Sequence, residues 1–113
     1  MAAPIIDAAT FAELQESAGA DFVGELIDTF FEEAPTMLAE LRRALASGDA
    51  EAFRRAAHSL KSNANTFGAL ALGGLARELE LGGLDAGRVA DALTRVDEEY
   101  RRAAAALAEL RGG

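Results

Sequence analysis

Apolar residues recur three and four positions apart along most of the chain, the spacing that places them on one face of an α-helix. The longest series runs from about Asp21 to Ser47. Its members are Val23, Leu26, Ile27, Phe30, Ala34, Met37, Leu38, Leu41 and Leu45. Pro35 lies inside the series and removes a hydrogen bond to the carbonyl of Phe31. The pattern predicts one helix with a bend near Phe31, although two helices also fit.

Gly48 and Asp49 separate this segment from the next one, because glycine is typical of a helix C-terminus and aspartate of an N-cap. The apolar residues of the next segment fall within a sector about 80° wide on a helical wheel. They are Phe53, Ala57, Leu60, Ala64 and Phe67. Such a short turn favours two antiparallel helices.

Two further helices are predicted after Gly68, which we expect to form the turn. The first has Leu72, Leu75, Ala76 and Leu79 facing inward, and its Gly73-Gly74 pair predicts either close helix packing or a loose first turn. The second, capped by Asp85, repeats apolar residues four and three apart. These are Val89, Leu93, Val96, Tyr100, Ala103, Leu107 and Leu110.

The N-terminal part of the chain carries a shorter helix signal. Thr10 and Glu13 have the spacing of a capping box, and Gly19 is placed to end the helix. This predicts a helix over about 10–18 that acts as a lid over one end of a bundle. The fold class is therefore all-α: an antiparallel up-and-down four-helix bundle over about 21–111, with the short additional N-terminal helix, in a single domain over 1–113.

Composition narrows the functions that the bundle can have. Half of the 113 residues are hydrophobic, cysteine is absent, and the single histidine makes a zinc site improbable, so we expect no metal site. A net charge of −8 disfavours binding to nucleic acid or to an anionic membrane. No signal peptide or membrane-spanning segment is recognisable, which predicts a cytoplasmic protein.

His58 and Lys61 are the only histidine and the only lysine, and they lie three residues apart on the same helix. His58 is about 140° from Phe53, the first residue of the buried stripe, so it should face solvent. A neutral imidazole is a nucleophile near pH 7, and a neighbouring ammonium stabilises anionic oxygens on a transferred group. Ser62, four residues after His58, is small enough to leave the ring accessible to a partner.

The run His58-Ser59-Leu60-Lys61-Ser62, with Gly68 six residues further on, resembles the motif of the histidine-containing phosphotransfer (HPt) domain family, His-x-Leu-Lys-Gly followed by a second glycine. Ser62 stands where glycine is commonest. Other stretches also resemble the family, and the likeness is close over roughly 22–81. They are Phe31-Glu32-Glu33-Ala34-Pro35, Gly48-Asp49 and Leu75-Ala76-Arg77-Glu78-Leu79-Glu80.

The resemblance implies a phosphorelay intermediary of two-component signalling. His58 would accept a phosphoryl group through Nε2 from the aspartyl phosphate of a receiver domain and pass it to the aspartate of another receiver, with Lys61 supporting the charge. The implied partners are response-regulator receiver domains and a hybrid histidine kinase. The chain would need no cofactor of its own, since Mg²⁺ would come from the receiver, and we expect a monomer.

Other residues near His58 have two interpretations each. Asn65 and Ser62 are candidates for hydrogen bonding to the phosphoryl group, but exposed polar residues on a helix are also commonplace. Arg54, one turn before His58, and Phe31 are candidates for partner docking. The sequence favours the alternative interpretations, which are a core aromatic for Phe31 and a solvated surface residue for Arg54.

There are three alternatives to phosphotransfer. A kinase is disfavoured because the chain has no glycine-rich phosphate loop and no nucleotide-binding domain, so we expect no enzymatic activity of its own. An acid–base enzyme is disfavoured because no acidic residue shares the arc of His58 on its helix. A helical adaptor that binds receiver or kinase domains without chemistry remains the competing hypothesis.

Overall fold

The computed structural model describes residues 5–112, and within them every regular element is an α-helix. The helices are α1 (Ala8–Ala18), α2 (Ala20–Ser47), α3 (Ala50–Phe67), α4 (Leu70–Gly82) and α5 (Ala86–Gly112). The all-α fold class is therefore confirmed, and α2 begins and ends within one residue of the sequence prediction. Because α2 is continuous through Pro35, the alternative of two separate helices is wrong.

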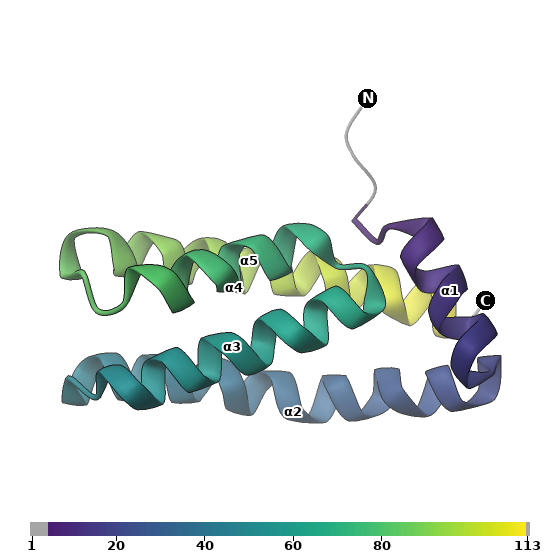
Figure 1. Cartoon of the computed structure of the whole chain (residues 1–113), viewed down its shortest axis with the longest axis horizontal. Helices are drawn as coiled ribbons and strands as arrows, with labels where there is room; N and C mark the ends of the chain where they lie inside the picture. Colours follow the sequence, from purple (N-terminus) through teal and green to yellow (C-terminus); the bar gives the residue numbers. More distant parts are fainter. Residues whose placement is uncertain (1–4, 113) are drawn as a thin grey trace.

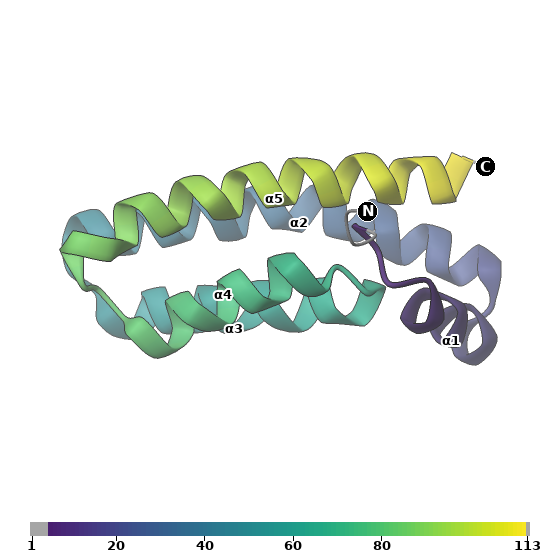
Figure 2. The ribbon, with the colours of Figure 1, turned by 90° about the horizontal axis from the view of Figure 1, so that it is seen from above.

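Helices α2 to α5 extend along the long axis of the molecule, while α1 lies at one end (Figure 1). Contacts join α2 to α3, α3 to α4, α4 to α5 and α5 back to α2, so the four long helices close around one core. Seen from above, α5 lies beside α2 and α4 lies beside α3 (Figure 2). Helix α1 contacts α2 and α3, and it buries Phe11 in the common core, as a lid would.

The predicted apolar stripes form the core. All five stripe residues of α3 are buried, and Phe30 of α2 stacks at an angle on Phe67 and edge-on against Tyr100. One stripe residue is an exception, because Leu110 is 47% exposed. Helix α4 has 13 residues and α5 has 27, so α4 covers only about half of α5 and leaves its last turns with fewer neighbours.

The helix ends follow the predicted capping residues with one correction. Asp49 accepts a hydrogen bond from the backbone of Ala52, and Asp85 accepts one from Gly87, as N-caps do. Helix α1, however, begins at Ala8 with Asp7 as its N-cap, and not at Thr10. The Asp7 carboxylate accepts hydrogen bonds from both the backbone nitrogen and the hydroxyl of Thr10, so the capping-box assignment was three residues late.

Two glycines fix how α3, α4 and the N-terminal segment meet. Gly68 has a φ of +86° in the turn, as predicted, and a Cβ there would lie 2.9 Å from the carbonyl oxygen of Asp7. Gly73 is buried, and a Cβ there would lie 2.0 Å from Oδ1 of Asn65 on α3. At Gly74 a Cβ would meet nothing within 4 Å. The glycine pair therefore serves close helix packing at Gly73 and not a loose first turn.

Candidate functional site

His58 lies on the outward face of α3, as the helical wheel predicts. Its side chain is 54% exposed, whereas Ala57 and Leu60 on the same helix are fully buried. The helix itself is anchored at both ends, by the Asp49 cap and by the turn at Gly68. A rigid helix therefore holds a solvent-accessible imidazole in a fixed position.

A carboxylate from the neighbouring helix holds one side of this ring. Nδ1 of His58 lies 2.7 Å from Oε2 of Glu80 on α4. The other oxygen of the same carboxylate, Oε1, accepts a hydrogen bond of 2.7 Å from Nζ of Lys61. Glu80 thus bridges the histidine and the lysine, and its own side chain is only 13% exposed. His58, Lys61 and Glu80 form a three-residue cluster across the α3–α4 contact, which we call the His58 cluster.

Hydrogen bonds set the protonation state of this cluster. The hydrogen bond from Lys61, followed by the one from His58, lowers the pKa of Glu80 below its ordinary value of 4.5. Glu80 is therefore ionised at neutral pH, and an ionised carboxylate only accepts hydrogen bonds. The contact consequently requires the hydrogen of a neutral His58 to be on Nδ1. The lone pair is then on Nε2, which has no hydrogen-bond partner among residues 5–112.

The Lys61 side chain is less exposed than its position on the helical wheel of α3 indicates. Its side chain is 24% exposed, and its ammonium group is directed to Glu80. A helical wheel of α3 places Lys61 on the same outward arc as His58, but such a wheel takes no account of α4. Its role in supporting phosphoryl charge stays a prediction.

Glu80 is the site residue that sequence reasoning missed. Helix α3 itself has no carboxylate near His58, which disfavours an acid–base enzyme when that helix is considered alone, but α4 brings a carboxylate to the ring. A signal was present in the sequence: His58 and Glu80 each lie eleven positions from Ala69 in the α3–α4 turn. In an antiparallel helix pair, equal distances from the turn place residues at the same height along the bundle.

The structure places the remaining candidates at different distances from His58. Ser62 is exposed and lies one turn after His58 on α3. Asn65 lies two turns away, roughly 10 Å along the helix axis, against Gly73. Gly68 lies further on, in the turn. Ser62 is therefore a neighbour of the His58 cluster, whereas Asn65 and Gly68 belong to the α3–α4 contact.

The two docking candidates also have structural partners. Nη2 of Arg54 lies 2.6 Å from Oε1 of Glu51, and both side chains are largely exposed. Phe31 is partly buried and packs against the core, which favours its interpretation as a core aromatic. A docking role for either residue stays a prediction.

Two further observations concern other kinds of site. Among residues 5–112, no three His, Asp or Glu side chains gather in an arrangement suited to a metal ion. None of the helices described combines the length and the apolar character that crossing a bilayer requires.

Comparisons with protein families and with solved structures both give matches. A family model described as Hpt domain matches residues 25–112. Among solved structures, the chain is similar to histidine-containing phosphotransfer protein B (HptB) from Pseudomonas aeruginosa PAO1, with 32% identity, a TM-score of 0.87, and coverage of 98% of this chain and 97% of that one. No curated protein sequence gives a significant match. The residues matched by the family model include the whole of the His58 cluster.

Proposed function

Because the chain belongs to the Hpt domain family, we propose that His58 is its phosphoryl-accepting residue and that the group comes from the aspartyl phosphate of a receiver domain and leaves to the aspartate of another receiver. Family membership establishes the coarser role, which is histidine phosphotransfer in the phosphorelays of two-component signalling. Hpt proteins act there as intermediaries and not as kinases. The residue, the direction and the two receivers are the content of the proposal.

One observation carries the assignment to His58: its ring is exposed while Nδ1 is held by Glu80 at 2.7 Å. This contact leaves the Nε2 lone pair as the nucleophile and keeps the ring from rotating about its χ angles. A pre-oriented nucleophile reduces the entropy that must be lost in the transition state. Glu80 is thus a positioning residue in the proposal, while His58 is the reacting one.

The proposed step is an in-line transfer. The Nε2 lone pair attacks phosphorus, the N–P bond forms, and the O–P bond to the donor aspartate breaks with its electron pair leaving on the carboxylate oxygen. The product ring carries phosphorus on Nε2 and hydrogen on Nδ1, so it is cationic, and the Glu80 carboxylate stabilises that charge. In the second transfer an acceptor carboxylate attacks phosphorus and the N–P electron pair returns to Nε2.

Other groups support this step. In the proposal Lys61 stabilises the phosphoryl oxygens, and its position three residues after His58 on the same helix supports this role. Ser62 leaves room for the partner. Asn65, two turns from His58, is the more distant of the two candidates for hydrogen bonding to the phosphoryl group. Mg²⁺ is expected from the acidic pocket of the receiver, and the chain needs no cofactor of its own.

The scaffold in this proposal is an antiparallel up-and-down four-helix bundle with α1 across one end, working as a monomer. The closed ring of contacts among α2 to α5 and the reversal of direction between consecutive helices in Figure 1 support that topology. A hybrid histidine kinase is the expected source of the phosphorylated receiver.

The test uses a receiver domain carrying labelled phosphate. Mixing it with the wild-type chain should give acid-labile, alkali-stable label on the chain, and His58→Gln should give none while keeping its helicity by circular dichroism. If several receivers of the source organism transfer no label to the wild-type chain, the relay proposal is wrong and the adaptor hypothesis gains.

A further inference from the structure

Arg54 lies on the outward face of α3, one turn before His58 and four positions earlier in the chain. Side chains four residues apart on a helix are neighbours, with about 5–6 Å between their Cβ atoms. An aromatic side chain on a helix also leans toward the helix N-terminus, so the ring of His58 lies over the turn that carries Arg54. A guanidinium group is therefore within reach of a group bound to that ring.

Arg54 is also on the same side of His58 as Lys61 and Glu80. Around the axis of α3, Arg54 is turned about 40° from His58 and Lys61 about 60°, both toward α4. The hydrogen bond to Glu51 is the main cause of the raised pKa of Arg54, and the negative charge of Glu80 raises that pKa further. His58 thus has one cation in the turn before it and one in the turn after it.

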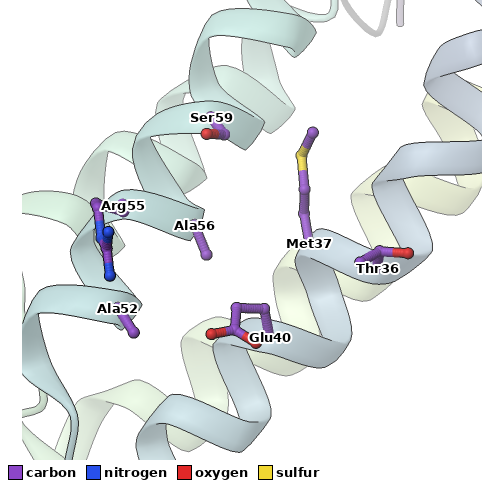
Figure 3. A pocket seen from close by; sticks show the side chains of 7 residues that line it. All are labelled: Thr36, Met37, Glu40, Ala52, Arg55, Ala56 and Ser59. Carbon is purple, nitrogen blue, oxygen red and sulfur yellow. The ribbon is translucent and has the colours of Figure 1, made fainter.

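The neighbouring arginine, Arg55, lies on the other flank of α3. It is turned about 60° from His58 in the opposite direction. It lines an open groove between α2 and α3 with a volume of about 390 Å³. Figure 3 shows Arg55 there, with Met37 and Glu40 across the open space on α2. Of the two arginines, only Arg54 is on the α4 side.

In the structure the guanidinium of Arg54 is directed to Glu51, which is further from His58 along α3. Nη2 lies 2.6 Å from Oε1 of that carboxylate, and Nε lies 3.3 Å from Oε2. Both partners are largely exposed, with 50% and 62% of their side chains accessible to solvent. Exposed ion pairs of this kind contribute little to stability, so Arg54 can change partners at little cost.

Lys61 is bound more firmly. Its ammonium donates to Glu80 at 2.7 Å, and the Glu80 side chain is only 13% exposed. A carboxylate that water reaches poorly depends more on its hydrogen-bond donors, so taking Lys61 from Glu80 costs more than taking Arg54 from Glu51. Of the two cations beside His58, Arg54 is therefore the one more readily available to a new anion.

We propose that Arg54 is a second phosphoryl-binding residue: once His58 carries a phosphoryl group, the guanidinium leaves Glu51 and binds the phosphoryl oxygens. The inference rests on the proposed function and adds to it a residue and its competitor. A phosphoryl group carries a charge of about −1.5 to −2 near pH 7, whereas Glu51 carries a single negative charge. A guanidinium also binds phosphate oxygens through two parallel hydrogen bonds. Both differences favour the exchange, and Glu51 limits how strongly Arg54 supports the transfer.

The test removes the receiver from the reaction. His58 is loaded with phosphoramidate, a small donor: its P–N bond breaks, the bond from phosphorus to Nε2 forms, and the nitrogen leaves as ammonia. The loading rate is measured for Arg54→Ala, Glu51→Ala and the double variant. Arg101→Ala is the matched control, because it removes an exposed arginine from α5, and α5 shares no contacts with α3 among the helices that the structure describes.

Arg54→Ala should slow loading about fivefold, because the charge that develops on the phosphoryl oxygens loses a donor, and the exposure of the site keeps the effect below that of a buried donor. Glu51→Ala should speed loading about twofold, since Arg54 is then free of its competitor. The double variant should match Arg54→Ala, because Glu51 acts only through Arg54. Arg101→Ala should load at the wild-type rate, and circular dichroism should show unaltered helicity throughout.

Two further measurements separate phosphoryl binding from a structural role. The Nε–H signal of Arg54 in NMR should shift when His58 is loaded, and it should stay in place when His58→Gln is treated with phosphoramidate. Arg54→Lys should recover part of the loading rate, because it restores the positive charge without the paired donors.

The contrary outcomes are distinct. An acceleration by Glu51→Ala that is equally large in the Arg54→Ala background overturns the inference, because Glu51 then acts as a distant charge. Equal loading rates for Arg54→Ala and Arg101→Ala, with an Arg54 signal that does not move, overturn it as well. A larger loss of rate in Arg55→Ala than in Arg54→Ala would place the second cation on the groove side and also overturn it. All three leave the proposed function standing, whereas if phosphoramidate never loads His58 the proposed function fails and the inference fails with it.

Discussion

Replacing Glu80 with alanine tests how the site prepares His58 for reaction. The substitution removes the acceptor for Nδ1 and the partner of Lys61 at the same time, since one carboxylate serves both at 2.7 Å. The ring can then rotate and can place its hydrogen on Nε2, which removes the nucleophilic lone pair in that tautomer. We therefore expect slower phosphorylation of His58 without loss of the fold.

The exposure of His58 determines how much Glu80→Ala should slow phosphorylation. At metal sites, loss of a carboxylate that orients a ligating histidine typically costs about 10- to 100-fold in activity, and the same orienting role sets the scale here. His58 is 54% exposed, so water can replace part of the lost hydrogen bond at Nδ1. The lower end of that range applies, and Glu80→Ala should slow phosphorylation about tenfold. Glu80→Gln should be milder, because its amide oxygen still accepts from Nδ1.

The assay follows the appearance of phosphohistidine with phosphoramidate as the donor, so that no receiver contact contributes to the rate. Glu78→Ala is the matched control, because it removes an exposed carboxylate from the same helix two residues away. Nitrogen-15 NMR of the imidazole supplies a second readout, since Glu80→Ala should raise the fraction of His58 with hydrogen on Nε2. Equal rates for Glu80→Ala and Glu78→Ala, with an unaltered tautomer, would refute the positioning role.

Three further predictions concern other contacts. Lys61→Ala should slow transfer to and from a receiver with an intact fold, and unchanged transfer kinetics would exclude a role in charge stabilisation. Gly74→Ala should stabilise the protein by up to about 1 kcal/mol in chemical denaturation, whereas Gly73→Ala should gain less or lose stability, and Asn65→Ala should restore the gain if the side-chain clash is the cause. Hydrogen bonds from the first turn of α1 lower the pKa of Asp7 below 3.8, so its contribution is present above that pH and is lost as pH falls through the lowered value. The denaturation midpoints of wild type and Asp7→Ala should therefore differ at pH 7 and converge as the pH falls through the lowered pKa of Asp7, and a constant difference would contradict the capping role.

Much of the fold could be predicted because each helix carries its own local signals. The α3 stripe from Phe53 to Phe67 is fully buried, and Gly48 with Asp49 marks the boundary between α2 and α3 correctly. Leu110 shows the limit of periodicity, because the heptad pattern continues past the point where α4 covers α5. The cap at Asp7 shows another, because the spacing of Thr10 and Glu13 also fits residues inside a helix that begins earlier.

The candidate site could also be predicted only in part. The outward direction of His58 follows from α3 alone, so the helical wheel predicts it. Glu80 belongs to another helix, and its contact with His58 depends on the register between α3 and α4. That register is fixed by the turn at Gly68 and by the close approach of Asn65 to Gly73, neither of which a single-helix analysis includes.

The most direct measurement is the chemical identity of the phosphorylated atom. After reaction with a phosphorylated receiver domain, long-range proton–nitrogen NMR of the imidazole distinguishes phosphorus on Nε2 from phosphorus on Nδ1. Because Glu80 holds the hydrogen on Nδ1, the predicted product is a single species phosphorylated on Nε2 of His58. Phosphorus on Nδ1, or a chain that receives no phosphoryl group on His58, would contradict both the orientation of the ring and the role assigned to it.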